Sequence, residues 1–491
     1  MTLVSERPAS DSKAGEHVEP VRRNGRWIDH WEPENPEFWE KTGKKVARRN
    51  LLFSVFAEHL GFNVWVLYSI LVTQMGAAGF VFMQGDAAVN NALILISTPV
   101  IVGAILRIPY TFAVSKFGGR GFTTFSAAML LIPTIGLAIA FSQPGTPMWV
   151  FLILAALTGF GGGNFSSSMA NISFFFPESK KGAALGINAA GGNLGVAVTQ
   201  LAMPLVITAA LLFTANDEAG YRFALSVAAL FWVPFILIAM FGAWTRMDSI
   251  SGAKPDGDSY PRAMKNKHTW IMAFLYIGTF GSFVGFSFAF PTLLRTYFPE
   301  LQNVGWMVAL GNLAFIGALV GSFSRPAGGW FADKVGGAKL TFLVFVGLSL
   351  SIAAVMGALA LESFPLYLIS FITLFVITGI GNGSTYRMIP MIFSASVRHR
   401  AESEGISTEA ALASAKRQAG AAIGVIGSIG AFGGFILQQA LRLSNVHLGS
   451  MAPAFWTYAV VFLLMAGVTW WYYLRTSFAI SRAPSLAHAN V

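Results

Sequence analysis

The sequence predicts an all-α polytopic membrane protein with twelve transmembrane helices arranged as two parallel six-helix repeats. Three observations lead to this fold class. The composition is apolar, with a mean hydropathy of +0.60 and 11% charged residues, whereas soluble domains carry roughly 25%. Twelve segments are long and apolar enough to span a bilayer. Glycine-rich and arginine-containing motifs recur at matching places in the two halves of the chain.

The twelve predicted spans follow from length, because a helix needs about 20 mainly apolar residues to cross the hydrocarbon core. Turns that contain Pro or Gly separate most of them. The second, fourth and eighth spans are rich in Gly or contain Pro, which blurs their ends. The spans cover approximately residues 50–75, 88–115, 120–141, 147–172, 182–211, 222–245, 269–297, 303–325, 339–361, 365–393, 419–441 and 453–475.

Polar stretches divide the chain into five parts. The first 45 or so residues are polar and lack the apolar core of a signal peptide. The longest polar stretch between spans separates six helices from six. The expected organisation is a cytoplasmic N-terminal segment (1–49), an N-terminal six-helix bundle (50–245), a central cytoplasmic loop (246–268), a C-terminal six-helix bundle (269–475) and a cytoplasmic tail (476–491).

Basic residues gather in the loops on one side of the predicted membrane, as at Lys44, Lys116, Lys180, Arg262 and Lys334. The opposite loops hold mainly acidic residues. By the positive-inside rule both termini are cytoplasmic, and we expect a bacterial cytoplasmic (inner) membrane. The same rule accounts for the net charge of +10, so the partners expected are membrane lipids and not nucleic acid.

The residues that carry enzymatic chemistry are not arranged as a catalytic site. Cys is absent, and the seven His are scattered without metal-ligand spacing. No nucleophile–base pattern or phosphate-binding loop stands out. We therefore expect no enzyme activity, no metal and no cofactor. Separately, we expect the protein to work as a monomer.

The two halves of the chain repeat in parallel. The run T-G-F-G-G-G (158–163) matches T-G-I-G-N-G (378–383), and A-A-L-G (183–186) matches A-A-I-G (421–424). Parallel six-helix repeats are the architecture of major facilitator transporters, which bind substrate near mid-membrane between the halves.

Two arginines complete this series of matches. Arg107 and Arg325 each lie in an apolar span, and each precedes a K-x-G-G turn by nine residues. A guanidinium at membrane depth is costly and cannot lose its proton, so it suggests a function. With no carboxylate expected beside them, two arginines form a doubly positive site that needs an anion. Guanidinium matches a planar oxyanion with two or three oxygens.

Other side chains suit the walls of such a site. Asn193 in the fifth span offers an amide, and Tyr276 and Phe280 lie one turn apart on one face of the seventh span. Phe165 in the fourth span is a further candidate. Aromatic faces exclude water and favour a flat ligand. The glycine runs let helices approach closely, so we expect a small, planar, monovalent anion.

Long motifs resemble the NarK-type nitrate/nitrite porter family of the major facilitator superfamily. The run G-G-G-N-F-S-S-S-M-A-N-I-S-F-F-F-P (161–177) is similar to the nitrate signature of that family, and T-G-I-G-N-G-S-T-Y-R-M-I-P (378–390) to its second-half partner. H-W-E-P-E-N-P-E-F-W (30–39) and L-R-I-P-Y (106–110) also resemble it. The similarity extends over about residues 28–475.

The resemblance implies a substrate, nitrate or nitrite, and roles for named residues. Arg107 and Arg325 correspond to the two anion-binding arginines of the family, and Phe165 to the aromatic residue that stacks on the bound anion. The signature asparagine of the fifth span corresponds to Asn193. Tyr276 and Phe280 correspond to the Y-x-x-x-F motif in the seventh span of the family.

Further charged residues are candidates for gating or proton coupling. Asp333, in G-G-W-F-A-D-K-V-G-G (328–337), resembles the superfamily loop motif, where its carboxylate could cap a neighbouring helix. Glu58 and His59 lie about two turns inside the first span. Arg387 lies at similar depth in the tenth. We hypothesise that Glu58 and Arg387 pair and close the cytoplasmic gate.

The coupling mode stays open at the level of sequence. Bound anion offsets the repulsion between the arginines, so an empty carrier returns poorly, which favours nitrate/nitrite exchange. Proton symport needs a titrating group, which Glu58 and His59 supply. We expect nitrate–proton symport, with exchange as the alternative. More remote alternatives are a transporter of another small anion and an anion channel.

Overall fold

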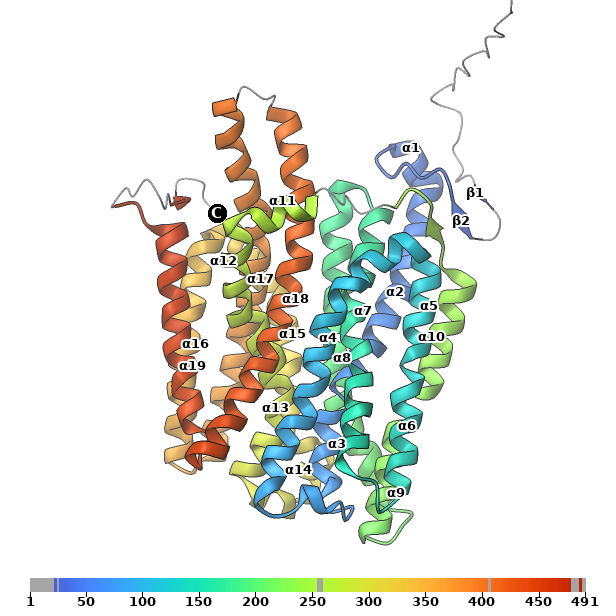
Figure 1. Cartoon of the computed structure of the whole chain (residues 1–491), viewed down its shortest axis with the longest axis vertical. Coiled ribbons are helices and arrows are strands. Elements are labelled where there is room, and N and C mark those ends of the chain that lie inside the picture. Colours follow the sequence, from blue (N-terminus) through green and yellow to red (C-terminus); the bar gives the residue numbers. More distant parts are fainter. Residues whose placement is uncertain (1–21, 24–25, 254–258, 405–407, 478–484, 488–491) are drawn as a thin grey trace, which may run out of the picture.

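Long helices stand side by side in this computed structural model, which describes residues 22–23, 26–253, 259–404, 408–477 and 485–487 (Figure 1). Within these residues, eleven helical segments are long and apolar enough to cross a membrane. First-half helices occupy one side of the molecule and second-half helices the other. The predicted all-α transmembrane fold is confirmed.

The first half contains the segments from α1 to α10. Their bounds are α1 Pro36–Phe38, η1 Trp39–Gly43, α2 Lys44–Val66, α3 Tyr68–Met75, η2 Val81–Met83, η3 Gly85–Ala87, α4 Ala88–Phe117, α5 Gly119–Met129, α6 Leu131–Ser142, α7 Met148–Phe175, α8 Glu178–Leu211, α9 Glu218–Leu230 and α10 Val233–Arg246.

The second half contains the segments from α11 to η7. Their bounds are α11 Ser259–Lys265, α12 Lys267–Tyr276, η4 Ile277–Gly281, α13 Ser282–Tyr297, η5 Pro299–Asn303, α14 Gly305–Ala309, η6 Gly311–Leu313, α15 Ala314–Val335, α16 Gly337–Ala360, α17 Phe364–Glu404, α18 Thr408–Leu448, α19 Ala452–Thr469 and η7 Trp470–Leu474.

The eighth span lies about ten residues later than the sequence predicts. Residues 305–313 form two short helical pieces, and the long helix is α15, Ala314–Val335. This helix is less apolar than the other spans, because it contains Arg325 together with several Gly and Ser residues. The prediction of 303–325 was wrong because the apolar residues of 304–310 were assigned to the span. As a result Arg325 lies in the middle of its helix.

Short strands join the N-terminal segment to the loop between the halves. Strand β2 (Trp27–Ile28) pairs antiparallel with β1 (Arg22–Arg23) and parallel with β3 (Ser249–Ile250). The first helical segment begins at Pro36, well before the predicted residue 50. Helix α11 lies across the same end of the bundle, and α17 and α18 project beyond it (Figure 1). The polar segments predicted on either side of the first half are therefore partly ordered.

Close packing brings the glycine motifs against the helices that carry the two arginines. A Cβ on Gly161 of α7 would overlap the carbonyl oxygen of Gly61 on α2, and a Cβ on Gly162 would lie 2.6 Å from Trp65. In the second half, a Cβ on Gly383 of α17 would overlap the carbonyl oxygen of Arg325. These glycines set the helix spacing around both arginines.

Replacing Gly161 by alanine is expected to destabilise the protein, because the methyl group meets backbone that cannot move aside. Overpacking of this kind costs about 1–3 kcal/mol, and we expect a lower Tm in detergent. Gly357→Ala on α16 is the matched control, since a Cβ there meets open space. Equal thermal stability of the two variants would contradict the packing argument.

Candidate functional site

Arg107 lies in α4 and is fully buried. Its Nε donates to the carbonyl oxygen of Gly162 at 3.2 Å, and its Nη1 donates to that of Gly427 at 3.1 Å. The Gly427 bond crosses from the first half to the second. Nη2 is buried and has no hydrogen-bond partner. One edge of the guanidinium is thus held by protein, while its remaining amino group is available to a ligand.

Arg325 lies in α15 with 9% of its surface exposed. Its Nη2 donates to the hydroxyl of Tyr276 at 3.3 Å, and its guanidinium carbon lies 5.5 Å from the ring centre of Tyr386. Nη1 is buried without a hydrogen-bond partner. Both arginines therefore keep one buried amino group that nothing in the described protein satisfies. Such groups are costly unless a ligand or water pairs with them.

Aromatic rings enclose the two guanidinium groups. The guanidinium carbon of Arg107 lies 4.7 Å from the ring centre of Phe165 and 5.0 Å from that of Phe280. The rings of Phe280 and Tyr276 are stacked, with centres 5.3 Å apart and planes 15° apart. Tyr276 ends α12, and Phe280 lies in the π-helix η4 that joins α12 to α13. Such a distortion is frequent at functional sites. Five of the six predicted substrate-binding residues thus form one cluster.

The sixth predicted residue, Asn193, lies in α8 and is 1% exposed. Its Oδ1 is buried without a hydrogen-bond partner. No hydrogen bond connects Asn193 to either arginine. The amide oxygen of Asn193 accepts hydrogen bonds and does not suit an anion. An anion at this site would instead contact the amide nitrogen, which donates.

Glu58 does not pair with Arg387 in this structure. It is 1% exposed in α2, and its Oε2 accepts a hydrogen bond from Asn188 at 2.6 Å. Asn188 also bonds to Ser168, which bonds to Ser54 at 2.8 Å. The Glu58 carboxylate interacts electrostatically with both Arg107 and Arg325. The expectation of an arginine pair without a carboxylate is therefore wrong. The structure is not closed by a Glu58–Arg387 pair, and a gate formed by that pair in the opposite state of the transporter stays a prediction.

Helix packing, which the sequence does not reveal, determines the direction of the Glu58 side chain. A Cβ on Gly192 of α8 would overlap the carboxylate of Glu58, so the small glycine leaves room for this side chain against α8. His59, the next residue, hydrogen-bonds through Nδ1 to the carbonyl oxygen of Gly191 at 2.9 Å. Both residues of α2 therefore face α8, and the Glu58 carboxylate is directed toward the interior.

Arg387 and Asp333 form an ion pair of their own, between α17 and α15. Both side chains are partly exposed, at 42% and 53%. Asp333 thus pairs with a cation in this structure, and its role as a helix cap stays a prediction. Exposed pairs of this kind contribute about 0–1 kcal/mol to stability. The pair ties together two neighbouring helices of the second half.

The charges of the buried cluster leave room for one monovalent anion. Two guanidinium groups and one carboxylate carry a net positive charge, and a single negative ligand would neutralise it. An uncompensated charge in a low-dielectric interior is strongly unfavourable. Within the residues that the structure describes, no group of three or more metal-ligating side chains is found. The arrangement suits a small flat anion in its charge, its forked donors and its aromatic faces.

Sequence reasoning missed several members of the site. Tyr386 lies beside Arg325, and Trp65 lies 5.8 Å from the guanidinium carbon of Arg107. Tyr386 belongs to the quoted motif 378–390, which was one available signal. Asn188, a polar residue in an apolar span, was another. The carbonyl partners of Arg107 carried no signal, because every residue has a carbonyl group.

Comparisons with known proteins show the family of this chain. A family model described as "Major Facilitator Superfamily" matches residues 51–438. The chain is 39% identical over 467 residues to the nitrate/nitrite transporter NarU of Escherichia coli strain K12, covering 93% of this chain and 98% of NarU. It is 33% identical over 463 residues to the "Probable nitrate/nitrite antiporter NarK2" of Thermus thermophilus, covering 92% and 97%.

Solved structures show a similar fold. A crystal structure of a D-xylose–proton symporter superposes with a TM-score of 0.61 at 14% identity, covering 87% of this chain and 97% of that one. An inward-open structure of the xylose transporter XylE from E. coli has a TM-score of 0.58 at 14% identity, covering 86% and 94%. At this level of identity the likeness concerns the fold alone.

Proposed function

We propose that this chain, which belongs to the Major Facilitator Superfamily and within it to the NarK-type nitrate/nitrite porters, moves nitrate and nitrite across a membrane by alternating access. The proposal rests on one observation above the others. Each half contributes a buried arginine with an unpartnered amino group, Nη2 of Arg107 and Nη1 of Arg325. The relatives named for nitrate and nitrite cover nearly the whole chain.

A planar oxyanion fits the cluster in charge and in shape. Each guanidinium presents N–H donors in a plane, which matches the oxygens of nitrate or nitrite. Phe165 and Phe280 lie near the Arg107 guanidinium and provide apolar faces for a flat ligand. Asn193 supplies an amide from α8. The residues that hold substrate are thus Arg107 and Arg325, with support from the residues just named and from Tyr276.

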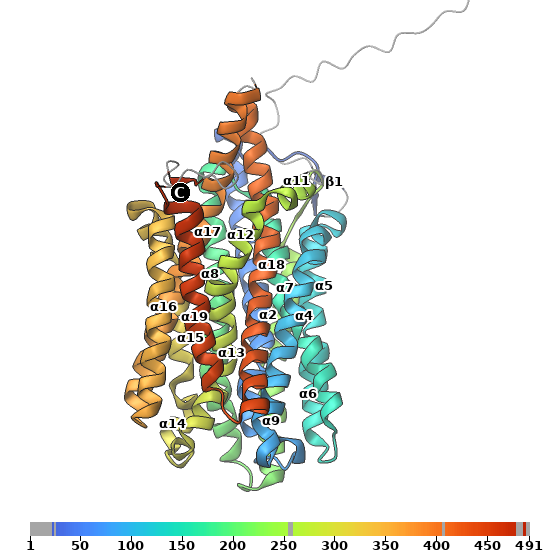
Figure 2. The same ribbon diagram turned by 60° about the vertical axis from the view of Figure 1, so that its left-hand side comes forward.

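Alternating access follows from the position of this cluster between the halves. The structure is closed at the end remote from the termini, where Gln200 donates to the carbonyl oxygen of Ser287 at 2.6 Å and Gln439 donates to Ser97 at 2.7 Å. Each of these bonds joins one half to the other. Helices α4 and α18, which carry Ser97 and Gln439, lie side by side in both views (Figures 1 and 2).

Proton symport is the coupling mode that Glu58 favours. Buried ionisable groups inside a membrane protein commonly take part in proton transfer. Glu58 interacts electrostatically with both arginines. A proton on Glu58 and an anion at the arginines favour each other, because each reduces the charge that the other faces. Such mutual support is what symport of nitrate and a proton requires.

Exchange of nitrate for nitrite is the second candidate, and the arginine pair favours it. Without an anion, two buried guanidinium groups face only one carboxylate, so the empty site carries uncompensated positive charge. A carrier of this kind returns slowly unless another anion occupies it. The name of the Thermus relative, an antiporter, points in the same direction.

Uptake of labelled nitrate into proteoliposomes tests both the substrate and the coupling. Vesicles are compared with and without an imposed pH gradient, and with and without nitrite inside. Accumulation driven by the pH gradient into empty vesicles supports symport, and uptake only into nitrite-loaded vesicles supports exchange. Saturation and trans-stimulation distinguish a carrier from a channel. Absence of nitrate flux in all four conditions, with flux of a short carboxylate, would overturn the proposed substrate.

The proposal includes the setting of the protein. It is an integral protein of the bacterial inner membrane, with both termini on the cytoplasmic side, where its basic loops lie. It acts as a monomer, because one chain supplies both arginines, and it performs no covalent chemistry. The domain boundaries are those of the two six-helix bundles on either side of residues 246–268.

A further inference from the structure

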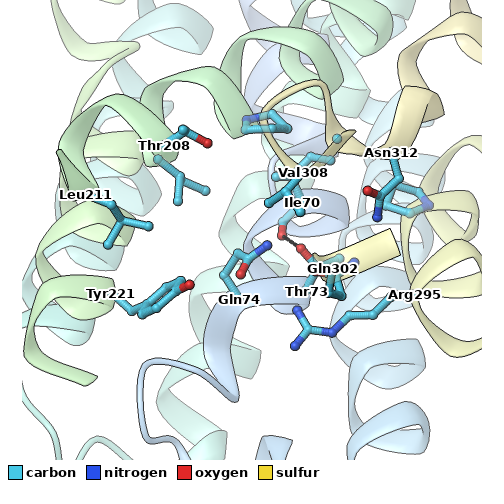
Figure 3. Close-up of a pocket in the computed structure, with 14 residues that line it drawn as sticks. Ile70, Thr73, Gln74, Thr208, Leu211, Tyr221, Arg295, Gln302, Val308 and Asn312 are labelled. Atoms are coloured by element: carbon cyan, nitrogen blue, oxygen red, sulfur yellow. Dashed lines mark hydrogen bonds between the residues drawn. The ribbon is translucent and has the colours of Figure 1, made fainter. Parts of the chain in front are cut away.

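A cavity lined by polar and apolar residues lies between the two halves at the end of the bundle remote from the termini, and we refer to it as the far-end cavity (Figure 3). It is lined by fourteen residues and has a volume of about 50 Å³. A single water needs roughly 10–15 Å³ by the same kind of measure. The far-end cavity therefore has room for a few waters or for one small polyatomic ion.

Arg295 is the charged residue of this cavity. It lies in the last turn of α13, and its Nη1 is buried without a hydrogen-bond partner. Figure 3 shows the guanidinium of Arg295 and the hydroxyl of Tyr221 directed toward each other across the cavity. None of the fourteen lining residues carries a carboxylate. The positive charge of Arg295 is therefore not neutralised by the cavity wall.

The remaining polar groups of the wall are neutral. Gln74 and Thr208 come from the first half, and Gln302 and Asn312 from the second. Amide and hydroxyl groups donate hydrogen bonds to anions without adding charge. A cation with neutral donors near it and apolar side chains over the rest of the wall suits a small anion. Like the Arg107–Arg325 cluster, the far-end cavity holds a buried guanidinium nitrogen without a hydrogen-bond partner, here from one arginine.

The backbone at the cavity wall is strained. Gly311, Asn312 and Leu313 have φ values of 58°, 52° and 66°, all in the left-handed region. That region is unfavourable for Asn312 and Leu313, which carry a Cβ, and is readily adopted by Gly311. Strain of this kind persists only where the surroundings hold it, and it is common at ligand sites. A Cβ on Gly311 would lie 2.8 Å from Pro204 of α8, so this turn packs directly on the other half.

The far-end cavity is separate from the central cluster. Arg295 lies fifteen residues beyond Phe280 in one continuous helical segment, which corresponds to about 22 Å along the axis at 1.5 Å per residue. Both halves line the cavity, as they do the central cluster. Because the halves separate at this end when the transporter opens there, the complete cavity exists only in the closed arrangement.

We propose that the far-end cavity is a second binding site for a small monovalent oxyanion, with Arg295 as its main ligand. It forms when the halves close at this end, so an anion bound there stabilises the closed gate. The choice of nitrate as probe rests on the proposed function, but the site does not depend on Arg107 or Arg325. Its test therefore compares loss of Arg295 with loss of Arg107.

Equilibrium dialysis of labelled nitrate against the purified full-length protein in detergent measures the number of sites. The expected result is two sites in the unmodified protein and one each in Arg295→Gln and Arg107→Gln. Arg295→Lys keeps the charge and is expected to retain the second site at reduced affinity. Arg222→Gln is the matched control, since Arg222 lies at the same end but pairs with Glu218 and donates to the carbonyl oxygen of Ala78.

The outcomes separate this inference from the proposed function. A single site that is lost in Arg107→Gln and unchanged in Arg295→Gln would overturn the far-end site and leave nitrate transport intact. A single site that is lost only in Arg295→Gln would support the far-end site and overturn Arg107 as a ligand in the proposed transport function. Unchanged central binding in Arg295→Gln also shows that the variant is folded, so loss of the second site there cannot be ascribed to unfolding.

Discussion

Replacement of Arg325 by lysine lowers the affinity for nitrate by about 10–100-fold, although the charge is retained. The guanidinium of Arg325 donates to Tyr276 through Nη2 and keeps Nη1 for a ligand. An ammonium group is a point charge and cannot hold both partners in one plane. Loss of one hydrogen bond to a charged group costs about 1.5–3 kcal/mol, which corresponds to that range. Arg325→Gln, which also removes the charge, abolishes measurable binding.

Binding to the purified protein checks this prediction without the complication of transport rates. Tyr276→Phe serves as a companion variant, because it removes the hydroxyl that positions Arg325 and keeps the ring that stacks on Phe280. A smaller loss is expected for Tyr276→Phe than for Arg325→Lys. Unchanged nitrate affinity in Arg325→Lys and Arg325→Gln alike would exclude Arg325 as a substrate ligand.

Replacement of Glu58 by glutamine strongly reduces accumulation driven by a pH gradient and leaves nitrate/nitrite exchange active. Glutamine has nearly the same shape and can still accept the hydrogen bond from Asn188, but it cannot carry a proton. Because the carboxylate is buried within reach of both arginines, no other carboxylate among the described residues is placed to substitute for it. We expect gradient-driven uptake to fall by at least about tenfold, as removal of an acid–base group does elsewhere.

The control for Glu58 is a carboxylate on the surface. Glu178 begins α8 and is 57% exposed, so Glu178→Gln should leave both modes of transport unchanged. Retention of exchange in Glu58→Gln shows that the protein is folded. If that variant still accumulated nitrate in response to a pH gradient, Glu58 would be a structural residue and the proton would use another route.

The sequence alone predicted the fold class and five residues that the structure brings together in one buried cluster. Hydropathy and length are local properties, so eleven of the twelve spans were found close to where the structure has them. Arg107, Arg325, Tyr276, Phe280 and Phe165 were predicted because a buried cation and recurring motifs are visible without coordinates. The eighth span was misplaced, since Arg325 and its glycines make α15 less apolar than the short segments before it.

Tertiary structure alone decided which charges meet. Helical periodicity places Glu58 and Arg387 at similar depths, but rotation of α2 directs Glu58 toward Asn188 of α8, while Arg387 pairs with Asp333. Likewise, Arg295 looks like an ordinary residue at a helix end until residues of both halves enclose it. A sequence determines which residues are buried along each helix. The orientation of neighbouring helices, which depends on packing between distant segments, determines the partners of each charge.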